Sequence, residues 1–141
     1  MRLKFDKIRR NPTHFFILTG FTIQEFNELA LEFRGQWEQH SSHFTLKGKT
    51  RQRKALRRKT NVLPGYQDKL LFILVYLESF PSQELQATAF SMTQPQANSW
   101  IHLLCNILHK TLEKINKISD LENKKVEQLL MDCQHVLSKK K

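Results

Sequence analysis

Cysteine is scarce in this chain, and the two that occur, Cys105 and Cys133, show no spacing typical of a disulfide framework. Long apolar runs are also missing, because the longest, residues 70–77, falls far short of the roughly 20 residues that span a bilayer. Residues 1–10 are charged and lack the apolar stretch of a secretion signal. These absences argue against a disulfide-rich secreted domain or a membrane protein, and we expect a protein of the reducing cytoplasm.

The patterns that carry enzyme chemistry are missing as well. Only four glycines occur, and none of them belongs to a phosphate-binding loop. The aspartates and glutamates are scattered without the spacing of paired catalytic carboxylates, and there is no nucleophile motif. We therefore expect neither a cofactor nor a catalytic activity of the chain's own.

A zinc site is the alternative considered for one group of residues. His102, Cys105 and His109 would share one face of a helix, and His40, His43 or Cys133 could supply a fourth ligand. A cysteine flanked by leucines inside a helix is more often a small core residue. We therefore expect no metal.

Acidic residues are few relative to basic ones. The chain has 13 Asp and Glu against 23 Lys and Arg, a formal net charge of +10, which favours a polyanionic partner. Residues 47–59 hold eight positive charges and no negative one, and the rest of the chain carries about +2. We expect a loop that a polyanion orders, although residues 52–59 could be helical. The residues expected to contact phosphate are Lys47, Lys49, Arg51, Arg53, Lys54, Arg57, Arg58 and Lys59.

Helical patterns fill most of the remaining sequence of 141 residues, which is long enough for one domain. A short helix should start at Pro12, with Asn11 as N-cap, and end at Gly20. The capping box of Thr22 and Glu25 opens a second helix that runs to about residue 38.

The C-terminal half begins with the most apolar segment. Residues 66–78 are apolar nearly all round, which predicts a helix at the centre of the core, since no second run of this kind exists to pair with it as a strand. Helices over residues 83–90 and from 94 to about 118 follow. We expect an all-α domain over residues 1–118, packed around Phe72, Leu74, Trp100 and Leu104, and a separate tail at 119–141.

The segment from Ser82 to about His109 has the pattern of a helix-turn-helix. Such a motif needs a short helix, a tight turn and a second helix that enters the major groove. Ala87 would lie where the helices approach most closely, while Ala97 and Trp100 face inward. Ser91 is the weak point, because glycine suits a left-handed turn residue better.

The exposed early residues of the second helix would then read bases. They are Gln94, Gln96, Asn98 and Ser99, with His102 one turn further on. Glutamine and asparagine suit adenine edges in the major groove. Ordinary polar residues on a solvated helix face would give the same pattern, and the basic loop by itself fits a solvated charge run or an RNA tether equally well. The loop and the helix pair together favour duplex DNA.

Two stretches carry a resemblance to a known family: GKTRQRKALRRK (residues 48–59) and LPGYQDKLLFILVYLESFPSQELQATAFSMTQPQANSWIHLLCNILHKTL (residues 63–112). They are similar to the N-terminal helix-turn-helix region of DDE-superfamily insertion-sequence transposases, in the group of insertion-sequence family five. The resemblance implies recognition of the terminal inverted repeats of a transposon and a nucleoid-associated place in the cytoplasm. Partners would be duplex DNA and a second copy or a full-length transposase.

The same family continues into a catalytic domain that uses three acidic residues and two metal ions. Residues 129–136, LLMDCQHV, resemble the start of that domain, with Asp132 in the place of its first aspartate. The expected continuation is missing, so we expect a truncated or frame-shifted chain in which residues 129–131 are a leftover, either packed opportunistically or disordered. The rival interpretation is an interaction module that dimerises through Leu108, Leu112, Ile115, Ile118 and Leu121.

Overall fold

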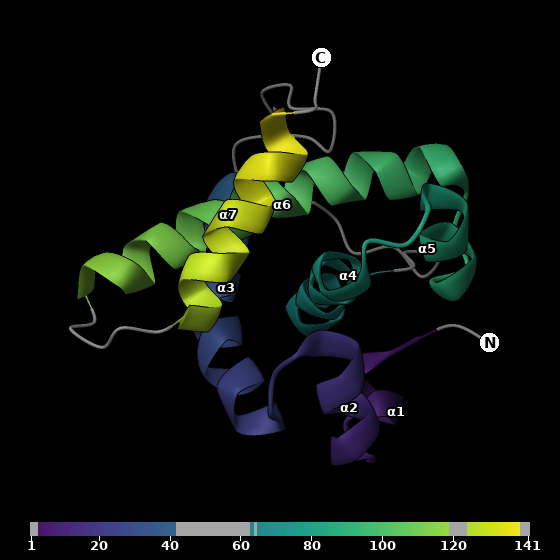
Figure 1. The fold of residues 1–141 in the computed structure, drawn as a ribbon, viewed down its shortest axis with the longest axis horizontal. Helices are drawn as coiled ribbons and strands as arrows, with labels where there is room; N and C mark the ends of the chain where they lie inside the picture. The colour runs from purple at the N-terminus through teal and green to yellow at the C-terminus, as the bar shows by residue number, and fades with distance from the viewer. Residues whose placement is uncertain (1–2, 42–62, 64, 119–123, 139–141) are drawn as a thin grey trace.

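The structure is a computed structural model that describes residues 3–41, 63, 65–118 and 124–138. Within these ranges the regular elements are all α-helices, which confirms the predicted all-α class (Figure 1). They are α1 (Phe5–Ile8), α2 (Pro12–Thr19), α3 (Ile23–Ser41), α4 (Tyr66–Ser79), α5 (Gln83–Ala89), α6 (Gln94–Ile118) and α7 (Lys124–Ser138). The basic segment 47–59 lies outside the described residues.

The ends of the first helices follow the capping signals in the sequence. The Asn11 side chain accepts a hydrogen bond from the His14 N–H at 3.1 Å, and Gly20 ends α2 with a left-handed φ of 77°. Thr22 and Glu25 form the reciprocal capping box at the start of α3, with bonds of 3.0 and 3.1 Å. Local side chains therefore satisfy backbone groups that each helix leaves unpaired.

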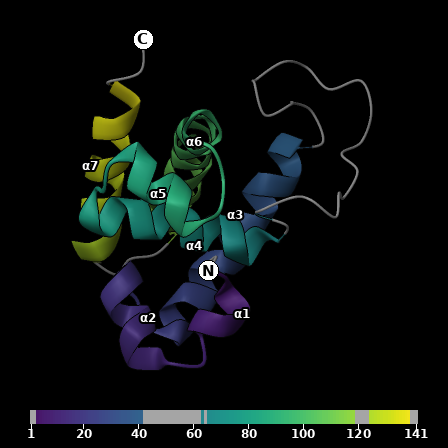
Figure 2. The same cartoon turned by 90° about the vertical axis from the view of Figure 1, so that its right-hand side faces the viewer.

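Helix α4 is the centre of the fold. It packs against α1, α2, α3, α6 and α7, so neighbours surround it in both views (Figures 1 and 2). Residues 69–75 and Leu77 are buried, as the continuous apolar pattern predicts. Phe72, Leu74 and Leu104, three of the predicted core residues, are buried in this region.

A buried lysine sits among the apolar side chains of α4. Lys69 Nζ donates to the Leu63 carbonyl at 2.6 Å and lies 4.6 Å from the ring centre of Trp37 and 5.7 Å from that of Trp100. Aromatic ring faces attract a cation, so this contact ties α4 to α3 and α6. Trp100, which the sequence places among the central core residues, is only partly buried and packs against the core at this junction.

Three phenylalanines join the N-terminal helices. Phe5 stacks on Phe26 with ring centres 5.0 Å apart, and Phe15 meets both rings edge-on at 6.0 and 5.1 Å. The Phe5 N–H also donates to Asp68 Oδ1 of α4 at 2.9 Å. Helix α1 was not predicted from the sequence, because its four residues are too few to show a helical period.

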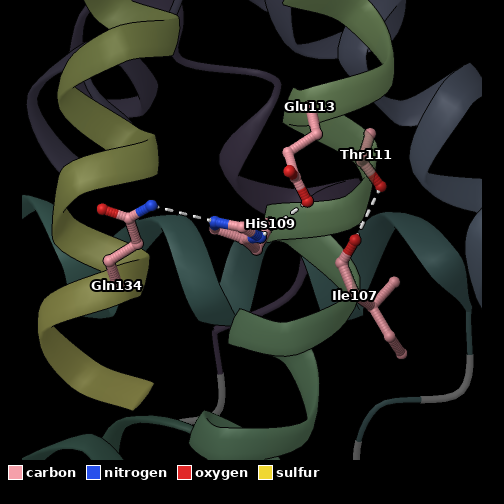
Figure 3. Close-up of polar contacts among 5 residues, drawn as sticks. All are labelled: Ile107, His109, Thr111, Glu113 and Gln134. Carbon is pink, nitrogen blue, oxygen red and sulfur yellow. Dashed lines mark hydrogen bonds and ion pairs between the residues drawn. The ribbon is translucent and has the colours of Figure 1, made fainter. Parts of the chain in front are cut away.

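The C-terminal segment folds as helix α7 and packs against α6 (Figure 1). Val126, Leu129, Cys133 and Val136 recur at helical spacing and belong to the same hydrophobic core as α4. His109 of α6 adds a polar contact, since its Nε2 lies 3.5 Å from Gln134 Nε2 and its Nδ1 lies 3.0 Å from Glu113 Oε1 (Figure 3). Asp132 therefore stands on a helix that covers the domain, not after an apolar strand.

Replacement by alanine should change the free energy of unfolding in opposite directions at Gly20, which ends α2, and at Gly35, inside α3. Gly20→Ala is expected to lower the free energy of unfolding by about 1 kcal/mol or more, because φ is 77° and the new Cβ would lie 2.8 Å from Glu78 Oε2. Gly35→Ala should raise it by about 0.5–1 kcal/mol, since nothing lies within 4 Å of its Cβ position in the helix. Urea unfolding measures both, and equal signs would contradict the assigned helix end.

The two cysteines should react slowly with thiol reagents in the folded protein. The neighbouring Cys133 thiol and burial together raise the pKa of Cys105 far above its usual range, and both side chains are fully buried. Because the thiolate is the reactive form, alkylation at neutral pH is expected to follow global unfolding. Mass spectrometry of the alkylated protein tests this, with the guanidinium-unfolded chain as control, and rapid labelling of the native protein would contradict the packing of α7 on α6.

Candidate nucleic-acid interface

Helices α5 and α6 are joined by residues 90–93, which form a defined turn. The Met92 N–H donates to the Ala87 carbonyl at 2.9 Å and the Ser91 N–H to the Thr88 carbonyl at 3.2 Å. Ser91 takes the left-handed conformation, with φ 55°. This pattern is a Schellman helix end in which serine stands where glycine is usual, as the sequence pattern indicates.

Each of the two packed helices buries a small side chain. Ala87 of α5 and Ala97 of α6 are both buried, and α5 packs directly against α6. Two further contacts fix α5 on the central helix: Gln86 Nε2 donates to the Phe72 carbonyl at 2.9 Å, and the Phe90 ring packs edge-on against Phe72 at 4.9 Å. The position of α5 is thus determined from two sides.

The start of α6 is capped reciprocally by Thr93 and Gln96. The Gln96 N–H donates to Thr93 Oγ1 at 3.3 Å, and the Thr93 N–H donates to Gln96 Oε1 at 3.0 Å. Gln96, which the sequence suggests as a base-reading residue, therefore also caps the start of α6. Its exposed side chain can still present its amide NH2 group.

The other base-reading candidates differ in exposure. Gln94 is exposed, whereas Asn98, Ser99 and His102 are partly buried. His102 Nδ1 lies 2.9 Å from the Asn98 carbonyl oxygen, so a neutral ring carries its proton on Nδ1 and leaves Nε2 as an acceptor. All five predicted base-reading residues thus lie in the first turns of α6, two of them exposed and three partly buried.

A residue of α5 that the sequence analysis missed lies beside this group. Gln83 Nε2 donates to Asn98 Oδ1 at 2.8 Å, and Gln83 Oε1 accepts a longer bond of 3.5 Å from Gln94 Nε2. Gln83 carries no sequence signal for this role, because 11 and 15 residues separate it from its two partners. Only the packing of α5 on α6 brings them together.

The first turn of α6 and the N-terminal segment each carry more positive than negative charge, although Asp6 pairs with Arg9 at 3.8 Å. The first turn of α6 contains no acidic residue, so its partial positive charge is not offset there, although Glu84 is exposed in α5. The Leu3 N–H donates to the Ala89 carbonyl at 2.9 Å, which brings the N-terminal segment alongside the end of α5. The basic residues described in and around α1 are Lys4, Lys7, Arg9 and Arg10.

The phosphate-contacting residues expected between α3 and α4 lie outside the described part of the chain. They are Lys47, Lys49, Arg51, Arg53, Lys54, Arg57, Arg58 and Lys59. In the sequence the segment falls between α3 and α4, and these two helices pack against one another. The contribution of the segment to DNA binding stays a prediction.

The zinc alternative has no support in the described ranges. No three His, Cys, Asp or Glu side chains there are grouped so that they could hold a metal ion. Cys105 is buried against Cys133. His102 contacts Asn98, and His109 contacts Glu113 and Gln134. His43 lies outside the described residues.

The apolar stripe of the rival interpretation is largely covered within the chain. Leu108 and Leu112 are fully buried, and Ile115 packs against the core, whereas Leu121 and the side chain of Ile118 lie outside the described part of the chain. Helix α7 packs against α6, which bears this stripe. Where the structure is described, no helix combines the length and the apolar character needed to cross a membrane.

Comparison of the chain with protein-family models, with curated proteins and with solved structures found no match. The resemblance to insertion-sequence transposases therefore stays a prediction from the motifs quoted above.

Replacing Ser91 tests the left-handed turn between α5 and α6. Ser91→Gly is expected to stabilise the fold by about 0.5–1 kcal/mol. Glycine removes about 1–2 kcal/mol of backbone strain from the folded state, and this gain is larger than the stabilisation of the unfolded state by the greater conformational entropy of glycine. Ser91→Val should destabilise it, since a branched side chain suits φ 55° least. Thermal unfolding of both variants measures the order, and a stabilising valine would contradict this turn geometry.

Proposed function

We propose that the chain is a duplex DNA-binding module of the transposase type, in which α5 and α6 act as a helix-turn-helix. The start of α6 would enter the major groove, and the target would be the terminal repeats of a transposon, as the sequence resemblance implies. The module would perform no catalysis of its own. A second copy or a full-length transposase is its proposed protein partner.

The turn between α5 and α6 is the observation that carries this proposal. A reading helix must be held at a fixed angle by its neighbour while its first residues stay accessible. The Schellman turn at Ser91 and the buried pair of Ala87 and Ala97 satisfy the first condition. Exposed Gln94 and Gln96 satisfy the second.

The chemistry of the exposed end supports a polyanionic duplex over a protein partner. Amide side chains can both donate and accept hydrogen bonds, as base edges in the major groove require. The excess of basic residues supplies sequence-independent attraction to phosphates, most of it from residues 47–59. The rival interpretation, dimerisation through the apolar stripe of α6, has less exposed apolar surface than the sequence pattern predicts, because Leu108 and Leu112 are buried within the chain.

Binding to duplex DNA should be steeply salt-dependent and should show sequence preference. We expect the affinity for duplexes selected from a pool with a randomised centre to fall as salt rises, with a log–log slope of about −0.9 for each phosphate neutralised. Arg57→Ala with Arg58→Ala should reduce the slope by about 2 and weaken all duplexes alike. Fluorescence anisotropy across a salt series measures both quantities.

Base reading is tested by variants at the start of α6. Asn98→Ala should weaken the selected duplexes by about tenfold relative to the unselected pool, because one base-edge contact is lost. Gln24→Ala is the matched control, since Gln24 is an exposed amide in the first turn of another long helix, α3. Equal binding of selected and unselected duplexes would reduce the module to a non-specific tether, and no binding at low salt would overturn the proposal.

A further inference from the structure

Three amide side chains at the contact between α5 and α6 form one hydrogen-bonded chain. Gln94 donates to Gln83 at 3.5 Å, and Gln83 donates to Asn98 at 2.8 Å. Gln94 and Asn98 are four residues apart, so they lie on one face of α6 in successive turns. Gln83 reaches that face from the first position of α5.

The two hydrogen bonds determine which end of each amide, the oxygen or the NH2 group, faces its neighbour. An amide has an acceptor end and a donor end at fixed positions on a rigid plane. Because Gln83 uses its NH2 group on Asn98, it offers its oxygen to Gln94. Asn98 then directs its oxygen at α5, and its Nδ2 is the end that remains for a ligand.

We infer that Gln83 is a positioning residue that sets the base preference of Asn98 by holding its amide with the donor end toward the DNA. The inference rests on the proposed function, and it names the chemistry of the base edge. A presented donor fits guanine, whose N7 and O6 are both acceptors, and thymine, through O4; adenine shows the N6 donor beside its N7 acceptor and fits less well. The two-bond pairing of asparagine with adenine would need the Asn98 oxygen to face the base, whereas Gln83 holds it toward α5.

One nearly isosteric substitution can reverse the order of donors and acceptors among these amides. In Gln83→Glu the side chain can only accept hydrogen bonds, so Asn98 must turn its NH2 group toward α5 and present its oxygen. The base opposite Asn98 should then be one with a donor, namely cytosine N4 or adenine N6. Gln83→Leu keeps the size and removes both bonds, so it should abolish the preference at this position and no other.

The experiment is selection of bound duplexes from a pool with a randomised centre, followed by sequencing, for the full chain and its variants. Asn98→Ala first identifies the base position that Asn98 reads, because preference is lost there. At that position we expect the ratio of guanine and thymine to cytosine and adenine to change by about tenfold between the wild-type chain and Gln83→Glu. Gln24→Glu, which adds the same charge in α3, should leave the ratio unchanged.

The outcomes separate this inference from the proposed function. If the wild-type chain selects sequences and Gln83→Glu selects the same ones, the role of Gln83 is overturned and the DNA-binding function stands. If the wild-type chain selects nothing, the proposed function itself fails. A purely structural role for Gln83 would lower the melting temperature and weaken every duplex alike, without moving the base ratio, and this result would also overturn the inference.

Discussion

Helix α4 can be buried on every side only if other helices surround it, and this requirement determines the arrangement of the chain. Burying its apolar side chains is the main favourable contribution available to a fold of this size. α3, α6 and the N-terminal helices cover α4 directly, and α7 packs across both α6 and α4. The candidate interface at the start of α6 depends on the same centre, because Gln86 and Phe90 anchor α5 to Phe72 of α4.

Helix starts and ends were the features most open to prediction from the sequence. Asn11, Thr22, Ser82 and Thr93 each cap a helix through bonds to residues a few positions away, so the signal is complete within a short stretch of sequence. The central place of α4 was also predictable, since a helix without a polar face has no stable position at the surface. In contrast, α1 is too short to show a helical period of apolar residues. The packing of α7 on α6 was not predictable either, because it depends on tertiary contacts.

The candidate site shows the same division between local and tertiary information. Local pattern placed Gln94, Gln96 and Asn98 at the start of a helix, and they are there. It did not foresee that Gln96 caps that helix or that Asn98 is bonded to α5, because both facts concern how a side chain is already used before any ligand arrives. The identity of exposed polar residues is therefore weaker information about recognition than the direction in which their donors and acceptors are held.

The junction around Lys69 has a practical consequence for studies in solution. Trp37 and Trp100 are the two tryptophans of the chain. Their ring centres lie 6.1 Å apart, and both rings are close to Nζ of Lys69, at 4.6 and 5.7 Å. Intrinsic tryptophan emission from this protein is consequently a single local signal, from the place where α3, α4 and α6 meet. Its intensity reports whether those three helices are together. Trp100 also lies on the same helix as the amides that we propose face DNA, so the signal comes from an element that the proposed ligand would touch.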